Sequence, residues 1–328
     1  MTRIQKMLFF LLTAFLLLLF LYKLNRSTQQ PSVLEQNKDR KVLVVIFNPN
    51  ISNQKLIAEK KWNAPSDLIK KFVEDITLVS KGRLNYQVIE LLEINQFPIK
   101  EDGFKYSQKV YLTCLSDPKK CHEKDTLDYK VLFDQFEVCK KVNRNELDEV
   151  WLFGGPYFGF YESRLAGPKA FFYNSPPLLA TNCQKLVPVM GFNYERSVSE
   201  MLESFGHRVE FTLTKVFENA KVNDWERFTR YDQKFPGKAE CGTVHFAPNS
   251  TRDYDWSNSN YALSNCDSWY SFPEVTHKPE LINCQKWGCQ GYDYKKYWLA
   301  LIPIAAGETK GIKNDWWSYI SNPNLIGK

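Results

Sequence analysis

The stretch KVLVVIF, residues 41–47, decides the fold class of this chain. Uninterrupted apolar residues follow Lys41, which is typical of a strand buried on both faces of a parallel sheet. A helix is expected next, because Pro65 and Ser66 form a helix start. Its apolar side chains recur at the spacing of one helix face, and they are Leu68, Ile69, Phe72, Ile76 and Val79.

Strands and helices continue to alternate after this first pair. Further strands are predicted at residues 86–94, 148–155 and 185–192, the last despite its proline, and a second helix at 129–143. This alternation predicts an α/β fold with a mostly parallel open sheet, layered like a Rossmann or flavodoxin fold. Neither GxGxxG nor GxxxxGK[ST] occurs, so the sequence offers no nucleotide-binding motif.

The N-terminus predicts export. MLFFLLTAFLLLLFLY, residues 7–22, has no charge, and extension to residues 4–24 gives the length of about 20 residues that a membrane-spanning helix needs. A cleaved signal sequence is the alternative, and the protein would then be secreted. The expected organisation is an anchor or signal at 1–24, a stem at 25–39, an α/β domain at 40–220, and a Cys/Trp-rich extension packed on it at 221–328.

The cysteines also point to an oxidising compartment. Their even number fits a set of disulfides, and the absence of any CxxC pair argues against structural zinc. The pairing cannot be deduced from the sequence. Glycosylation sequons begin at Asn25, Asn50 and Asn249, which makes the chain a candidate glycoprotein. The eight cysteines are Cys114, Cys121, Cys139, Cys183, Cys241, Cys266, Cys284 and Cys289.

Charge and aromatic content limit the classes of partner that the sequence predicts. The formal net charge is +6, but four positive residues lie in and around residues 4–24, and no long basic tract follows. Nucleic acid is therefore not an expected partner. Seven of the nine tryptophans lie after residue 220, which suggests a surface suited to stacking on sugar rings.

Candidate catalytic residues follow from the rule that open α/β sheets bind ligands beyond the carboxyl ends of their strands. Two such segments, FGGPYFGFYESR and GFNYER, contain Glu162 and Glu195, which we predict as paired acid/base carboxylates. The alternative is structural, with Glu195 complementing a helix dipole and Glu162 pairing with a nearby arginine. Substrate-binding residues predicted at the same strand ends are Tyr157, Tyr161, Asn193, Tyr194 and Arg196.

A second hypothesis concerns a metal. Glu203 and His207 lie one turn apart on the helix expected after residue 194, about 150° away from its apolar face, so they need a covering layer to form a site. We expect this helix to continue past Gly206. A zinc, calcium or manganese site would use Glu203, His207, His245, Asp253 and Asp255. The alternative is a solvated Glu–His pair, and convergence of His207 and His245 near Glu203 distinguishes the two.

Three blocks carry a resemblance to other sequences. FGGPYFGFYES, GFNYERSVSEMLESFGHR and HFAPNSTRDYDW resemble stretches of uncharacterised extracytoplasmic proteins, over roughly residues 145–328. The resemblance implies export and carries no activity with it. The DYD triplet, residues 253–255, also resembles the D-x-D of anchored luminal glycosyltransferases, although no apolar strand precedes it.

The sequence thus supports three functional hypotheses. The first is an exported, membrane-anchored hydrolase of glycan or peptide material that uses acid/base or metal-assisted chemistry. The second is a surface module that binds a glycan or another partner without turnover, and the third is a luminal glycosyltransferase. No G-x-S-x-G motif supports a serine nucleophile, and oxidised cysteines cannot act as nucleophiles.

Overall fold

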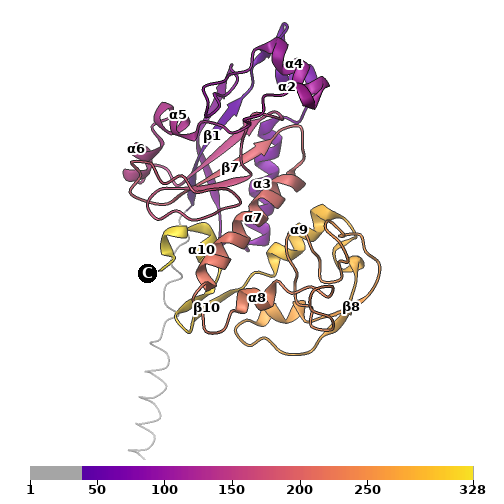
Figure 1. Ribbon diagram of the computed structural model, residues 1–328. Helices are drawn as coiled ribbons and strands as arrows, with labels where there is room; N and C mark the ends of the chain where they lie inside the picture. The colour runs from indigo at the N-terminus through magenta and orange to yellow at the C-terminus, as the bar shows by residue number, and fades with distance from the viewer. Residues whose placement is uncertain (1–38, 328) are drawn as a thin grey trace, which may run out of the picture. The chain divides into compact units, whose positions relative to one another are not determined.

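The computed structural model describes residues 39–327 (Figure 1), and one compact unit spans Asp39–Lys328. The predicted membrane segment at 4–24 and nearly all of the predicted stem lie outside the described residues. Among residues 39–327, no helix is both long enough and apolar enough to cross a membrane. The predicted domain boundary at residue 220 remains a prediction.

A mostly parallel sheet of five strands forms the centre of the fold, which confirms the predicted α/β class. The outer strand β6 runs antiparallel to β7, and the other neighbours are parallel. No strand was predicted over the residues of β6. In spatial order the strands are β4 (Tyr86–Ile94), β1 (Arg40–Phe47), β5 (Glu149–Gly154), β7 (Val187–Asn193) and β6 (Ser163–Ala166).

Helices cover both faces of this sheet (Figure 1). The helices α3 (Pro65–Val79) and α7 (Val198–Phe217) lie on one side, with α5 (Tyr129–Gln135) and α6 (Val138–Asn143) on the other. Val42–Val45 of β1 are fully buried as a result, which explains the unbroken apolar run. The single helix predicted at 129–143 is wrong in one respect: Glu137 adopts a left-handed conformation that divides it into α5 and α6.

The helix α7 continues through Gly206, as expected. It begins with a capping box between Ser197 and Glu200, so its N-cap is Ser197. A side chain at Gly206 would place its Cβ 2.4 Å from a methyl carbon of Val244. Gly206 therefore permits close packing of the C-terminal region against α7 and does not end the helix.

The C-terminal region forms a third layer over α3 and α7. Its helix α9 (Gly291–Ala300) contacts both helices. Asp75 of α3 is buried and accepts a hydrogen bond of 2.6 Å from the Tyr292 hydroxyl, and Lys296 lies 3.5 Å from the same carboxylate. This layer covers the face of α7 that contains Glu203 and His207, as the metal hypothesis required.

The tryptophans of this region mostly build its core. Trp225, Trp269, Trp298 and Trp316 are almost fully buried and pack ring against ring. Because six of the seven C-terminal tryptophans are buried, only the half-buried Trp256 has a ring that reaches the surface. The expectation that these indoles form a sugar-stacking surface is therefore wrong.

The remaining elements are short. Those before β5 are β2 (Asn50–Ile51), β3 (Gln54–Lys55), α2 (Leu56–Lys60), α4 (Gln108–Ser116) and η1 (Pro118–Lys120). Those after α7 are α8 (Asp224–Phe228), β8 (Ala262–Ser264), η2 (Cys266–Ser271), β9 (Glu280–Ile282), η3 (Cys284–Trp287), β10 (Ile304–Thr309), β11 (Ile312–Asp315), α10 (Trp317–Ser321) and η4 (Pro323–Leu325).

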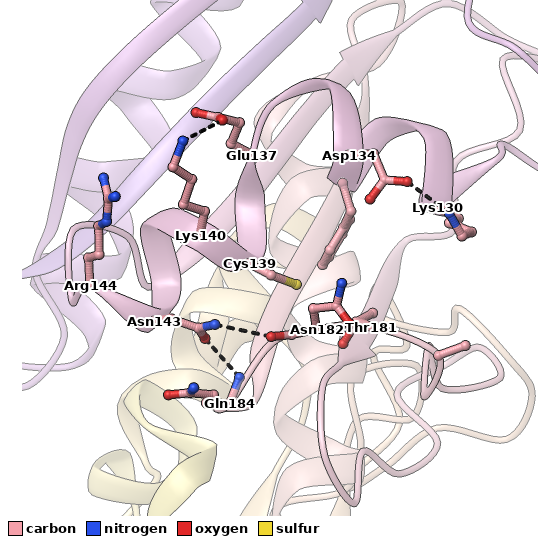
Figure 2. Close-up of a pocket in the computed structure, with 12 residues that line it drawn as sticks. Lys130, Asp134, Glu137, Cys139, Lys140, Asn143, Arg144, Thr181, Asn182 and Gln184 are labelled. Carbon is pink, nitrogen blue, oxygen red and sulfur yellow. Dashed lines mark hydrogen bonds and ion pairs between the residues drawn. The ribbon is translucent and has the colours of Figure 1, made fainter.

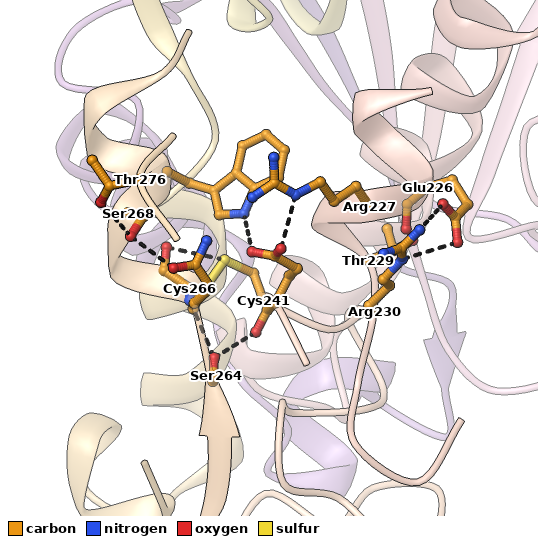
Figure 3. Close-up of polar contacts among 12 residues, drawn as sticks. Glu226, Arg227, Thr229, Arg230, Cys241, Ser264, Cys266, Ser268 and Thr276 are labelled. Carbon is orange, nitrogen blue, oxygen red and sulfur yellow. Dashed lines mark hydrogen bonds and ion pairs between the residues drawn. A yellow bond between two sulfur atoms is a disulfide. The ribbon is translucent and has the colours of Figure 1, made fainter. Parts of the chain in front are cut away.

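All eight cysteines form disulfides, which suggests an oxidising extracellular or luminal compartment. Figure 3 shows the Cys241–Cys266 bond beside Arg227, whose guanidinium donates a 2.8 Å hydrogen bond to Glu240. The four bonds are Cys114–Cys121, Cys139–Cys183, Cys241–Cys266 and Cys284–Cys289.

The sequons differ in accessibility. Asn249 is buried, and its side-chain amide donates hydrogen bonds to the carbonyl oxygens of Asn258 and Asn260. A glycan on this amide is incompatible with the fold. Asn50 is exposed, and Asn25 lies outside the described residues.

Removing the Cys241–Cys266 disulfide is expected to lower the free energy of unfolding by about 3 kcal/mol, because the bond closes a long loop in the unfolded chain. Its sequence separation is 25, against 5 for Cys284–Cys289, whose removal should cost about 2 kcal/mol. Urea denaturation of the two Cys→Ser double variants measures the difference. A larger loss for the Cys284–Cys289 variant would contradict the expectation.

Candidate metal centre

Two histidines and a glutamate meet on the covered face of α7. Glu203 and His207 lie one turn apart on this helix, and His245 comes from the loop after α8. One ligand atom from each of the three side chains lies within 4.8 Å of the other two. The imidazole rings of His207 and His245 are 4.7 Å apart between centroids. The covering layer therefore brings together the residues that the metal hypothesis required.

The inner side of the cluster is formed by one nitrogen of each histidine. Nε2 of His245 lies 3.3 Å from Oε1 of Glu203, and Nε2 of His207 lies 3.6 Å from Oε2 of Glu162. The His245 Nε2 atom is buried, and no described residue forms a hydrogen bond with it. This nitrogen is free to coordinate an ion.

The outer nitrogens of both rings contact carboxylates. Nδ1 of His207 lies 3.2 Å from Glu210, and Nδ1 of His245 lies 3.2 Å from Asp253. Glu210 is itself fixed, since its second oxygen accepts a 3.0 Å hydrogen bond from the backbone N–H of Val244. Metal-binding histidines characteristically donate their second N–H to a carboxylate or carbonyl, which sets the ring orientation.

The charges favour a bound cation. Burial alone would raise the pKa of Glu203, but the adjacent His245 and Lys295 lower it to about 2, so the carboxylate is ionised. Burial alone would also lower the pKa of His207, but its carboxylate neighbours, Glu210 first, raise it. The raised pKa of His207 reflects the negative charge of its carboxylate neighbours, which would also attract a divalent cation.

Two further side chains border the cluster, and nothing in the sequence marked them. Lys295 of α9 is buried and lies 2.7 Å from Oε2 of Glu203, which leaves Oε1 of that carboxylate to face His245. Tyr254 packs its ring 4.4 Å from that of His245 and has a left-handed backbone. The Lys295 contact joins residues 92 positions apart, which explains why local patterns missed it.

A cavity of about 210 Å³ lies at the carboxyl ends of β5 and β7 and reaches the cluster. Glu203 belongs to both, and Glu162, which lies 3.6 Å from His207, also lines the cavity. The predicted residues that line it are Tyr157, Glu162, Asn193 and Arg196.

The other predicted catalytic and substrate-binding residues lie elsewhere. Glu195 is exposed and does not line this cavity, although its Oε1 accepts a 3.4 Å hydrogen bond from Asn193, which does. Tyr161 packs beside Tyr129 and Arg164. Tyr194 is fully buried, and its hydroxyl donates a 3.0 Å hydrogen bond to the Phe47 carbonyl, so it stabilises the core.

The two aspartates of the DYD triplet have different partners. Asp253 contacts His245, whereas Asp255 accepts hydrogen bonds from Thr251 and Asn258 and orders its own loop. Asp255 is therefore not part of the cluster. The luminal glycosyltransferase therefore stays a prediction.

The cavity beside the cluster lies one strand away from the position at which the sheet topology predicts a ligand site. Chain connections reverse direction between β1 and β5, and ligands usually bind there. Here Leu56, Trp62 and Tyr111 fill that place, and a side chain at Gly155 would meet the Tyr111 hydroxyl at 2.5 Å. Asn48 is buried, with its amide oxygen accepting from Ile57 N–H. The open space is instead between β5 and β7.

A larger cavity, of about 600 Å³, lies beside α5 and α6 (Figure 2). Figure 2 shows that four of its five charged side chains form pairs, Lys130 with Asp134 and Lys140 with Glu137. Among the described residues, the Glu203–His207–His245 group alone has the spacing of a metal site. We therefore take the smaller cavity as the functional one.

Comparisons of the chain with protein-family models, with curated proteins and with solved structures give no match. The resemblance of the three sequence blocks to extracytoplasmic proteins stays a prediction.

Proposed function

We propose that this protein is an exported metal-dependent hydrolase whose metal is bound by Glu203, His207 and His245. The observation that supports the proposal is the arrangement of the two imidazoles. Nδ1 of each ring contacts a carboxylate, and Nε2 of each ring lies beside a glutamate that lines the cavity. Two nitrogens and one carboxylate are a ligand set typical of zinc in hydrolases, with manganese next. Calcium is disfavoured because it takes oxygen ligands.

The chemistry follows from the position of Glu162. A bound zinc lowers the pKa of a coordinated water to about 7 and so supplies a nucleophile at neutral pH. Glu162 lines the cavity beside His207 and is suited to accept the proton of that water as a general base. Asn174 orients Glu162 by donating a 2.6 Å hydrogen bond to its carboxylate.

Arg196 and Tyr157 lie at the wall of the cavity, where they would bind substrate. The backbone carbonyl of Tyr157 is fixed by a 2.6 Å hydrogen bond from the buried Lys100. Polar and aromatic side chains in one small cavity suit a glycan or peptide substrate. An exported hydrolase of such material, attached to the membrane through residues 4–24, is the full proposal.

The test begins with the protein purified from an oxidising compartment. Elemental analysis should find close to one zinc or manganese per chain, and a chelator should abolish hydrolysis in a screen of glycan and peptide substrates. Glu162→Gln should keep the metal and lose the activity. A protein that takes up no divalent metal at neutral pH would refute the metal centre. Extraction of the native protein by alkaline carbonate would refute the membrane attachment.

A second candidate function is glycan binding without turnover, which a separate polar cavity in the C-terminal region favours. In that case a glycan array would show binding while every hydrolytic assay stayed negative. Metal loading would then leave hydrolysis absent, which distinguishes the two functions.

A further inference from the structure

We infer that the bond cleaved at the metal centre is an amide, and that Tyr254 donates the hydrogen bond that stabilises the oxyanion formed on its carbonyl oxygen. This role rests on the proposed hydrolase. It narrows the substrate from glycan or peptide material to a peptide bond or the acetamido group of an N-acetylated sugar. The two share the same amide chemistry, and a glycosidic bond does not.

The cavity at the metal centre leaves one carboxylate for proton transfer. Asp125 is paired with the buried Lys100. Glu200 accepts hydrogen bonds of 2.9 and 2.8 Å from the backbone N–H and the hydroxyl of Ser197. Glu203 is a proposed metal ligand, and Lys295 lies 2.7 Å from it. Glu162 is therefore the remaining base among the acidic residues that line the cavity, which are Asp125, Glu162, Glu200 and Glu203.

A single free carboxylate favours a carbonyl substrate over a glycosidic bond. Glycosidases characteristically place two carboxyl groups beside the bond, one as an acid and the other as a base or nucleophile. Glu195, the predicted partner of Glu162, is exposed and does not line the cavity. Hydrolysis of a carbonyl compound needs one base for the attacking water and a hydrogen-bond donor at the oxygen where negative charge develops.

The ring of Tyr254 is held against the metal cluster. Its centroid lies 4.4 Å from that of His245 and 5.2 Å from that of Trp256. The Tyr254 backbone N–H donates a 3.2 Å hydrogen bond to the His245 carbonyl. Its φ of 58° lies in the left-handed region, which costs a residue other than glycine about 1–3 kcal/mol and is typical of functional sites.

The hydroxyl of Tyr254 lies near the carboxylates of the site. Burial raises the pKa of this hydroxyl, and the negative charges of Glu203, Asp253 and Glu162 raise it further. The hydroxyl is therefore protonated at neutral pH and can donate a hydrogen bond. Since Glu203 and Glu162 line the cavity and Tyr254 is 49% exposed, a substrate in the cavity can reach this donor.

The roles of the two side chains follow in order. Glu162 accepts a proton from a water at the cluster while the water oxygen forms a bond to the carbonyl carbon. The π electrons of the C=O bond move to its oxygen, which accepts a hydrogen bond from Tyr254. When this electron pair re-forms the C=O bond, the C–N bond breaks, and the proton on Glu162 passes to the leaving nitrogen. One water is consumed, and a carboxylic acid and an amine are released.

The experiment uses the intact, zinc-loaded protein with two substrates, a mixed peptide library and the tetramer of N-acetylglucosamine. An amine-reactive fluorophore detects amide cleavage in both, and a reducing-end assay detects glycosidic cleavage in the tetramer. We expect new amines from one of the two substrates, which identifies the source of the amide, and no new reducing ends.

Tyr254→Phe keeps the ring against His245 and removes only the hydroxyl. It should lower kcat by at least about 100-fold with KM and zinc affinity little changed, because the hydrogen bond forms in the transition state. Inorganic phosphate, a tetrahedral anion, gives a readout without turnover: calorimetry should show affinity at least about 10-fold weaker in this variant. Tyr261→Phe is the matched control, since Tyr261 is 62% exposed and does not line the cavity.

Several results would overturn the amide assignment or the role of Tyr254. Reducing ends without amines, or amines from neither substrate, would exclude the amide. An unaltered kcat or an unaltered phosphate affinity in Tyr254→Phe would exclude the donor, and a loss of zinc affinity would give the ring a structural role instead. Failure of the unaltered protein to take up zinc would refute the proposed metal centre itself, so the zinc content distinguishes the two failures.

Discussion

Replacement of His207 with alanine is expected to lower the affinity for zinc by more than about 100-fold. The substitution removes one of three ligands, whereas loss of an outer carboxylate typically costs about 10–100-fold. His207 is only partly buried and lies on the side of α7 away from the sheet, so the variant should fold. Competition with a chromophoric chelator at neutral pH measures the constant.

A series of variants tests the carboxylates that orient the imidazole rings, and not only the proposed ligands. Glu210→Gln and Asp253→Asn leave all three ligands in place but loosen the rings, and each should weaken zinc binding about 10–100-fold. Glu195→Gln is the matched control, because this nearby glutamate is exposed and outside the cavity. Its affinity should equal that of the unaltered protein.

Two outcomes would contradict the metal centre. If His207→Ala binds zinc as tightly as the unaltered protein, the ion is elsewhere. If the outer carboxylate variants have no effect while Glu203→Gln does, the imidazoles are not coordinating through oriented rings. Thermal denaturation of each metal-free variant verifies that the fold is intact.

The sequence could predict one half of this site. The spacing of Glu203 and His207 is local, and the helical angle showed that they needed a covering layer. What covered them was not predictable from periodicity, because His245 is 38 positions away in an irregular loop. Gly206, in the middle of α7, is the point where Val244 packs closely. The two segments meet because a side chain is missing there.

The errors share a physical cause. Tyr194 was assigned to ligand binding from its position at a strand end, and the C-terminal tryptophans from their chemistry. Large amphipathic rings also fill cores, however, when a hydroxyl or indole N–H finds a partner. Tyr194 finds the Phe47 carbonyl, and Trp269 donates a 2.9 Å hydrogen bond to Glu240. Long-range hydrogen bonds of this type leave no trace in a local pattern. The strands of the sheet were easier to predict, because the apolar residues that indicate a strand are close together in the sequence.

A buried ion pair joins α7 to the sheet. Arg208 and Glu149 are almost completely buried, with a 2.7 Å contact between them. Glu149 also accepts a 2.7 Å hydrogen bond from Trp151, and Arg208 donates one of 2.9 Å to the Ile320 carbonyl of α10. Burial alone would lower the pKa of Arg208, but Glu149 above all raises it, so the guanidinium is charged. The pair thus connects sheet, helix and C-terminus.

Substituting Arg208→Met is expected to lower the free energy of unfolding by about 4 kcal/mol, since Glu149 would remain buried without its counter-charge. Urea denaturation at neutral pH measures the loss. The double variant Arg208→Met/Glu149→Leu should recover most of it, because replacing both partners with apolar groups leaves no buried charge. Arg230→Met is the control: its pair with Glu226 is exposed, and it should cost at most about 0.5 kcal/mol. Equal losses for the two single variants, or no recovery in the double variant, would show that the buried pair does not stabilise the fold in this way.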